Sequence, residues 1–259
     1  MPKHPFHLVT SSPLPLVTSV SLSLVVFGFL IVIVRHDMTI LVLALLFLFF
    51  VLAQWFYAIV VEATFQGKHT LKVQSGLKLG MAFFIASEVI FFFGFFFTYC
   101  FFSLSPPVEF GATWPPTGIR PLNPFHLPLL NTVILLTSGI TITCAQTSIL
   151  WNLNSSISGS IVNTLLCAFF FIVIQCFEYW ICPFTISDRV FGSVFYLATG
   201  FHGLHVLIGA IFLWVCLVRS VACHFSPTRH LGFTFACWYW HFVDVVWVLL
   251  WVLFYCWGS

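Results

Sequence analysis

Seven long apolar runs occupy most of this 259-residue sequence. They lie at about 16–34, 38–61, 79–105, 127–151, 157–182, 190–218 and 231–257. A helix of about 20 apolar residues crosses the roughly 30 Å hydrocarbon core of a bilayer. Backbone N–H and C=O groups in lipid must bond within their own segment, and for continuous apolar runs this requires helices. The runs therefore predict an all-α integral membrane protein with seven transmembrane helices.

The composition supports this class and excludes others. Hydrophobic residues make up 61% of the chain and charged residues only 6%, whereas an average soluble domain has about 25% charged residues. A formal net charge of +2 provides no basic field, so we expect no nucleic-acid partner. The nine cysteines form no C-x-x-C pair, and nearly all lie inside apolar runs. They indicate small buried hydrophobes rather than disulfides or a zinc site.

The segments between the runs are short. The longest, Pro106 to His126, contains six prolines and two glycines and predicts an irregular surface loop. No internal repeat or long linker divides the sequence, so we expect one polytopic membrane domain over residues 1–259. The stretch from Met1 to Pro15 has one lysine and four prolines and does not resemble a cleavable targeting signal.

The basic residues of the loops predict an orientation. With seven spans, six of them fall on the N-terminal side and three on the other side. The two sets are Lys3, Lys68, Lys72, Lys78, Arg219 and Arg229, against Arg35, Arg120 and Arg189. The positive-inside rule then places the N-terminus inside, in a matrix or cytoplasm.

Two glutamates within the apolar runs are candidates for chemistry. Glu88 lies near the middle of the third run, where an ionised carboxylate is costly, so we expect it to be protonated, hydrogen-bonded or both. A proton-relay or regulatory carboxyl and a neutral polar tie between helices both fit this position. Glu178 lies closer to an interface, which favours a structural or headgroup role.

Three histidines and an aspartate form a second group. His202 with His205, and His241 with Asp244, are each spaced i,i+3 and so share a helical face. Together with the two glutamates they match the residue types of a di-metal site in a helix bundle, and a haem ligand is another possibility. The spacing fits neither H-E-x-x-H nor paired Glu-x-x-His helices. The alternative is a structural polar cluster in which histidine-to-aspartate hydrogen bonds join the last two helices, with no metal.

Several segments closely resemble subunit III of the haem-copper cytochrome c oxidases, the mitochondrial respiratory complex IV. They are TFQG (64–67), WPPTGI (114–119), PLNP (121–124), PLLNT (128–132), PFTISD (183–188), ATGFHGLH (198–205), WYWHFVDVVW (238–247) and the ending WGS (257–259). The resemblance extends over nearly the whole chain. One departure is Arg189, which stands where glycine is common in the family.

This resemblance implies a fold and a function. The fold is a pair of helices splayed from a bundle of five, with a lipid-filled cleft. The family's chain carries no redox or catalytic centre. It supports the catalytic subunit, which with subunit II and other subunits reduces oxygen with electrons from cytochrome c while protons are pumped. Haem a and copper belong to partner subunits, and subunit III supports assembly, lipid binding and sustained proton uptake. The implied location is the mitochondrial inner membrane, with the N-terminus in the matrix.

The same resemblance directs attention to phospholipid. Cationic side chains bind phosphate, and arginine can do so with two donors. We therefore expect Arg219 and His69 to bind headgroups, Glu62 and Thr64 to orient them or meet a headgroup hydroxyl or amine, and Trp55 to anchor at the interface. The competing interpretation is that Arg219 caps the C-terminal end of the sixth helix.

Two functions from other classes remain as alternatives. A stand-alone transporter or channel would use Glu88 and Asp244 along its path, and it should show repeat symmetry or Gly/Pro-broken helices in matching positions. A membrane di-metal oxidase would retain iron or copper after separation from its partners.

Overall fold

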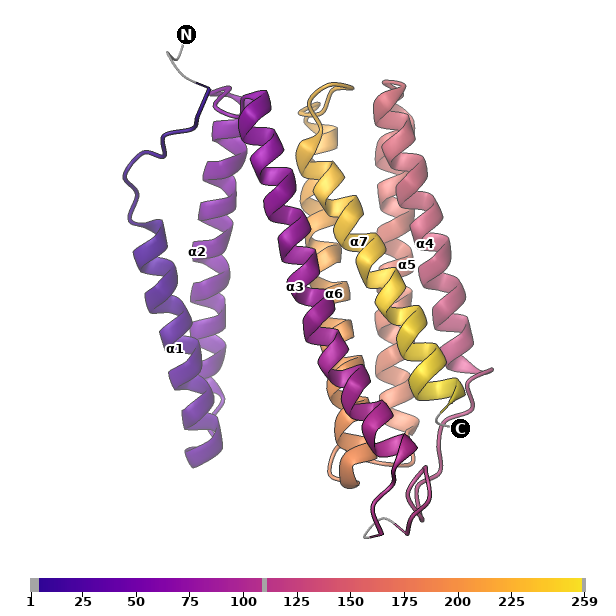
Figure 1. Ribbon diagram of the computed structural model, residues 1–259. Coiled ribbons are helices and arrows are strands. Elements are labelled where there is room, and N and C mark those ends of the chain that lie inside the picture. Colours follow the sequence, from indigo (N-terminus) through magenta and orange to yellow (C-terminus); the bar gives the residue numbers. More distant parts are fainter. Residues whose placement is uncertain (1–4, 109–110, 258–259) are drawn as a thin grey trace. The chain divides into compact units, whose positions relative to one another are not determined.

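The computed structural model describes residues 5–108 and 111–257. The named elements in these residues are all helices (Figure 1). They are α1 (Leu14–Arg35), α2 (Thr39–Thr64), α3 (Leu71–Leu104), α4 (Leu127–Leu150), α5 (Asn154–Ile181), α6 (Arg189–Val221), α7 (Leu231–Leu250) and the π-helix η2 (Trp251–Cys256). The described residues contain seven helices long and apolar enough to cross a membrane, with η2 continuing α7. The predicted all-α fold with seven spans is confirmed.

The predicted boundaries agree with the observed ones to within a few residues, except at the start of α3. We expected this span to begin near 79, but the helix begins at Leu71. Lys72 and Lys78 lower the local hydropathy, yet lysine is a good helix former. Thr70 supports the first turn, because its hydroxyl accepts a hydrogen bond from Val73 N at 3.4 Å. With 34 residues, α3 is longer than a bilayer requires.

Some residues on which the sequence predictions rest lie outside the described part of the chain. They are residues 1–4, with Lys3 of the inner basic set, residues 109–110 of the predicted loop, and Gly258 and Ser259 of the family-like ending.

The chain divides into two compact units, Met1–Leu77 and Lys78–Ser259. In the first unit, α1 packs closely on α2. A Cβ atom built on Gly28 would lie only 2.8 Å from Leu41 Cα, so the absence of a side chain permits this approach, as at many membrane helix interfaces. The segment before α1 contacts the turn between α2 and α3, where Thr70 donates to the carbonyl of Pro5.

In the second unit, α7 is the most buried of the membrane-crossing helices. Its indole groups connect it to α4. Trp240 donates to Ser138 Oγ at 2.9 Å and Trp247 donates to Thr132 Oγ1 at 3.0 Å. Both indoles are fully buried. These bonds fix the register of the two helices, since hydrocarbon offers no other hydrogen-bond partner.

Large aromatic rings mediate the packing of α3 in the same unit. Phe92 lies 6.2 Å from Phe242 of α7, and Tyr99 lies 4.2 Å from Phe254 of η2, measured between ring centroids. Phe92 and Tyr99 are buried, whereas most other α3 side chains are exposed in the single chain. These aromatic side chains therefore make the buried contacts between α3 and the end of the chain formed by α7 and η2.

Candidate functional site

Glu88 of α3 and His205 of α6 form a carboxyl–imidazole pair in the second unit. Glu88 Oε2 lies 2.8 Å from His205 Nε2. The histidine side chain is 10% exposed and the glutamate side chain 23%. Both residues lie well inside helices that span the membrane. The hydrogen bond expected for Glu88 is therefore present, and its partner is a histidine that the sequence analysis had placed in a separate group.

The second ring nitrogen of His205, Nδ1, determines which hydrogen lies between Glu88 and His205. Nδ1 lies 2.6 Å from the backbone oxygen of Phe201. A carbonyl oxygen only accepts, so Nδ1 carries the hydrogen. Without another proton, Nε2 and the Glu88 carboxylate would face each other as two acceptors. One shared proton resolves this, either as a neutral carboxyl donating to Nε2 or as an imidazolium donating to the carboxylate. The 2.8 Å contact thus requires a hydrogen between Glu88 Oε2 and His205 Nε2.

Aromatic rings pack around the imidazole of His205. The ring centroid of His205 lies 5.1 Å from that of Phe92, 6.2 Å from Phe242 and 6.3 Å from Tyr239. Phe91 stacks on the imidazole from α3 at 6.5 Å. Apolar rings keep the local dielectric low, which strengthens a hydrogen bond that is formed and penalises one that is broken.

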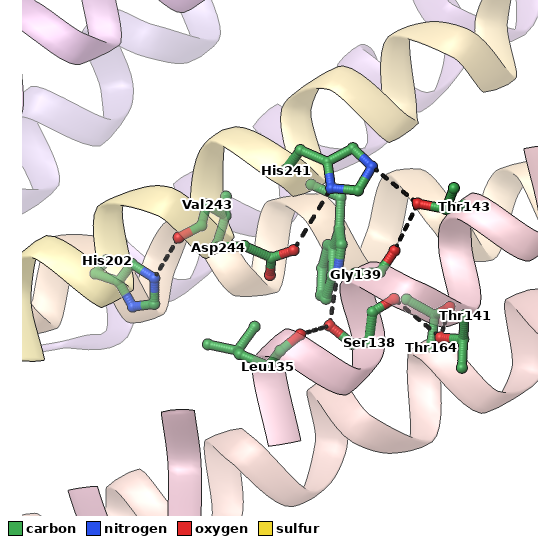
Figure 2. A network of polar contacts seen from close by, with 11 residues as sticks. Leu135, Ser138, Gly139, Thr141, Thr143, Thr164, His202, His241, Val243 and Asp244 are labelled. Carbon is green, nitrogen blue, oxygen red and sulfur yellow. Dashed lines mark hydrogen bonds and ion pairs between the residues drawn. The ribbon is translucent and has the colours of Figure 1, made fainter. Parts of the chain in front are cut away.

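His202, one turn before His205, contacts α7 instead of α3. Its Nε2 lies 3.1 Å from the backbone oxygen of Val243, and Figure 2 shows this contact beside Asp244. We expected histidine-to-aspartate hydrogen bonds between the last two helices. Among the described residues, His202 instead bonds to a backbone carbonyl of α7. The other histidine of the i,i+3 pair, His205, bonds to Glu88 of α3.

His241 and Asp244 remain together on α7, but only loosely. Nδ1 of His241 lies 3.7 Å from Asp244 Oδ2, and Nε2 lies 3.5 Å from Thr143 Oγ1 of α4 (Figure 2). Within residues 5–108 and 111–257, no group of three or more His, Cys, Asp or Glu side chains is placed to hold a metal ion. The histidines and carboxylates considered for a di-metal site therefore belong to separate contacts.

Two of the residues nominated for lipid in the first unit, Glu62 and His69, lie in a polar group with His7 and Lys68. His7 Nε2 lies 3.6 Å from Glu62 Oε2, and Lys68 Nζ lies 3.8 Å from Oε1. The ring of His69 lies 5.8 Å from that of His7. Partial desolvation and the neighbouring His7 lower the pKa of His69, and Glu62 opposes this shift. Thr64, like Trp55 on the same helix, is half-buried.

Arg219 lies in the second unit, in the last turn of α6. Its guanidinium carbon is 4.7 Å from the centre of the Phe225 ring. A Cβ atom built on Gly232 would lie 2.7 Å from Nη1, so this glycine makes room for the guanidinium. Nε is buried without a hydrogen-bond partner among the described residues. The group therefore retains at least one unused donor.

A buried network at the other end of the second unit was not predicted. Glu178 Oε1 accepts hydrogen bonds from Tyr255 Oη at 2.6 Å and from Gln175 Nε2 at 3.4 Å. Glu178 is only 1% exposed, which favours the structural interpretation over a headgroup role. Tyr255 lies in η2, the π-helical turn that follows α7. No local feature of the sequence indicates that Tyr255 contacts Glu178.

Residues 4–259 match the family described as cytochrome c oxidase subunit III. Cytochrome c oxidase subunit 3 of Carassius auratus is 49% identical over 256 residues, covering 99% of this chain and 98% of that protein. The subunit 3 proteins of Aedes aegypti and Pisaster ochraceus are each 48% identical, over 256 and 257 residues. The latter match covers 99% of both chains.

Proposed function

Since the chain belongs to the cytochrome c oxidase subunit III family, and is thus a non-redox subunit of that complex, we propose that it supports sustained proton uptake by the catalytic subunit. The observation that carries this proposal is the Glu88–His205 pair. It brings a carboxyl and an imidazole together inside a membrane-spanning bundle, with Glu88 Oε2 and His205 Nε2 2.8 Å apart.

The proposed role is to hold a proton at a fixed place in the membrane while the complex turns over. Desolvated carboxyl and imidazole groups are the side chains used for proton relays within membranes. Either protonation form of the pair preserves the hydrogen bond, so a proton can shift between Oε2 and Nε2 without a packing change. The chain's own contribution is therefore to bind and orient the proton.

Turnover measurements on the assembled oxidase test this role. Glu88→Gln and His205→Gln should retain normal haem content, because an amide keeps a hydrogen bond in place of the lost group. Their initial oxygen consumption should be close to that of the unaltered complex and then decline faster over many turnovers. Glu178→Gln is the matched control, since it also alters a buried, hydrogen-bonded carboxyl. Equal persistence of all three variants and the unaltered complex would contradict the proposal.

The second part of the proposal is phospholipid binding at the polar groups near the inner ends of the helices. Arg219 is supported by its buried, unused Nε donor and by the space that Gly232 leaves for it. Glu62 is placed to orient His7 and Lys68 in the first unit. Trp55, Thr64 and His69 complete the nominated set. Each unit thus provides its own polar group for a headgroup.

Lipid analysis of the purified complex tests Arg219. Arg219→Ala should lower the retained anionic phospholipid while the subunit content stays unchanged, and Arg219→Lys should retain more lipid than the alanine variant. Arg229→Ala, in the following loop, is the control for a general loss of positive charge. If Arg219→Ala retained as much anionic phospholipid as the unaltered complex, Arg219 would not be a lipid ligand. Capping of the C-terminal end of α6 would then explain this residue.

The remaining features of the proposal follow from family membership and from the loop charges. The chain forms one polytopic domain in the mitochondrial inner membrane, with its N-terminus in the matrix. It packs with subunits I and II and further subunits of the oxidase, for which cytochrome c is the electron donor. The haem a and copper of the complex are held by partner subunits. Gentle native purification in which the chain co-migrates with haem a absorbance would support this assignment, and migration without haem would contradict it.

A further inference from the structure

Glu178 of α5 carries a buried carboxyl group that has no part in the Glu88–His205 pair. It is almost completely buried and belongs to a membrane-crossing helix. None of the ion pairs among the described residues includes it. An ionised carboxylate in such a place needs a cation or a full set of donors, because burial removes the water that would solvate its charge.

The hydrogen bonds to this carboxyl are unevenly divided between its two oxygens. Oε1 accepts from Tyr255 Oη at 2.6 Å and from Gln175 Nε2 at 3.4 Å. Oε2 is also buried, but it has no hydrogen-bond partner among the described residues. This division matches a neutral carboxylic acid, in which one oxygen accepts and the other carries a hydrogen. An ionised carboxylate would offer two equivalent acceptors, one of them unused.

A second buried acceptor lies in the same network. Asn131 of α4 is fully buried, and its Nδ2 donates to Gln175 Oε1 at 3.3 Å. Its own oxygen, Oδ1, has no donor among the described residues. With Glu178 ionised, the network of Asn131, Gln175, Glu178 and Tyr255 would thus bury two acceptors that lack a donor in the described chain. A hydrogen on Glu178 Oε2 removes one of these acceptors and adds a donor to the network.

The titratable side chains around Glu178 carry no charge at neutral pH. They are Tyr255 of η2, Tyr179 of α5, Cys182 at the end of α5 and Tyr196 of α6. Phenols and thiols in water ionise above pH 7, at about pH 10 and 8.5. None of these four groups therefore supplies the positive charge that would stabilise a carboxylate.

We propose that Glu178 binds one proton on Oε2 in the assembled oxidase, and that this proton locks the C-terminal turn η2 onto α4 and α5. With the proton in place, Oε1 still accepts the phenol hydrogen of Tyr255. Loss of the proton leaves an unbalanced negative charge inside the bundle. It therefore favours opening of η2, which lets the carboxyl reach water. This inference is independent of the role proposed for Glu88.

The proton gives the attachment of η2 a pH dependence of defined sign. A glutamate in water ionises at about pH 4.3, so Glu178 is ionised near neutral pH when η2 is open and protonated when η2 is closed. Opening then releases one proton, and the opening equilibrium rises about tenfold for each pH unit. An alkaline medium weakens the lock and an acidic medium strengthens it.

Hydrogen exchange of the C-terminal peptide in the intact oxidase measures this opening. The exchange rate of the peptide that contains Tyr255 is divided by its rate in Glu178→Gln, which cancels the pH dependence of the exchange chemistry. The ratio should rise about tenfold per unit between about pH 6 and 8, because glutamine has no proton to lose. Asp188→Asn removes a half-buried carboxyl just before α6 and should leave this rise unchanged. A ratio that stays constant with pH would overturn the lock.

Infrared spectroscopy of the purified oxidase tests the proton itself. A protonated carboxyl has a C=O band that an ionised carboxylate lacks. The spectrum of the unaltered oxidase minus that of Glu178→Gln, both at neutral pH, should contain this band. A difference that contains carboxylate bands instead would show an ionised Glu178, balanced by a buried water or cation, and would overturn the inference.

Assembly of two variants distinguishes a neutral from a charged group at this site. Glu178→Gln should assemble with unchanged haem content, since a neutral amide replaces a neutral acid. Tyr255→Phe should also assemble, and its C-terminal peptide should exchange faster at neutral pH because one buried hydrogen bond is lost. Failure of Glu178→Gln alone to assemble would show that the network requires a negative charge and would overturn the inference. This outcome would leave the proposed role of the Glu88–His205 pair unaffected.

Discussion

Ser138→Ala is expected to loosen α7 from α4 by removing one buried acceptor. The Ser138 hydroxyl donates to Leu135 O at 2.6 Å and accepts from the Trp240 indole at 2.9 Å. Both Ser138 and Trp240 are fully buried. Without the hydroxyl, the indole N–H has neither a protein partner at that position nor access to water.

The size of the effect follows from this burial. A buried donor left without a partner costs about 1–3 kcal/mol, and measured interhelical bonds in membranes average about 0.6 kcal/mol with a maximum near 1.7. We expect a loss of about 1–2 kcal/mol in the free energy of opening. This corresponds to a factor of about 5–30 in the opening equilibrium.

Labelling of Cys237 can measure this opening in the intact oxidase. The thiol is fully buried on α7, one turn before Trp240, so a membrane-permeant maleimide reacts only when α7 opens. If reclosing is faster than reaction, the labelling rate follows the opening equilibrium. Ser138→Ala should therefore raise the rate of Cys237 labelling by about 5–30-fold.

Two controls isolate the indole bond. Ser87→Ala removes an exposed hydroxyl that also bonds three residues back, to Phe84 O at 2.6 Å, and it should leave the Cys237 rate unchanged. In a Trp240→Phe background, Ser138→Ala should have a much smaller effect, because no donor remains to be left unsatisfied. Equal rates for Ser138→Ala and Ser87→Ala would refute the reasoning.

Three further predictions concern orientation, pH and backbone strain. Accessibility labelling should find Lys72 and a tag placed after Ser259 on opposite sides of the membrane, because seven spans separate the N- and C-terminal sides; the same side for both would contradict the topology. The pKa of His69 is lowered in the folded chain, so its contribution to stability is fully present above about pH 6.5 and is lost as the pH falls toward the folded value. Hydrogen exchange around His7 should accordingly increase on acidification from about pH 7, and His69→Gln should reduce that increase. Arg189 has a φ of 57°, where a non-glycine residue is strained, so Arg189→Gly should raise the thermal midpoint of the complex, with a gain of about 1 kcal/mol; a lowered midpoint would show that the contacts of the arginine outweigh this strain.

The membrane spans could be predicted because apolar length is a local property of the sequence. Each run is long enough to require a helix in lipid, whatever it packs against. The start of α3 was wrong for the same reason. Hydropathy locates the apolar part of the helix, whereas Lys72 and Lys78 lie in helical turns that precede it.

The functional site could be predicted only in part, because its contacts are tertiary. The cost of burying Glu88 identified it as unusual from the sequence alone. Its partner His205 is 117 residues away, and the shared face of His202 and His205 does not show that one contacts α3 and the other α7. The Tyr255–Glu178 bond depends on the π-helical turn at the end of α7, which no periodicity in the sequence indicates.

The most direct measurement for the central claim is the modification of Glu88 in the purified oxidase by two carbodiimides, one apolar and one soluble only in water. Mass spectrometry of the Glu88 peptide gives both rates. A protonated carboxyl inside the membrane, hydrogen-bonded to His205, should react faster with the apolar reagent, and continued oxygen consumption should fall as the adduct accumulates. Glu88→Gln should assemble and resist this inactivation. Faster reaction with the water-soluble reagent, or failure of Glu88→Gln to assemble, would contradict the account of Glu88 as a proton-holding carboxyl inside the membrane.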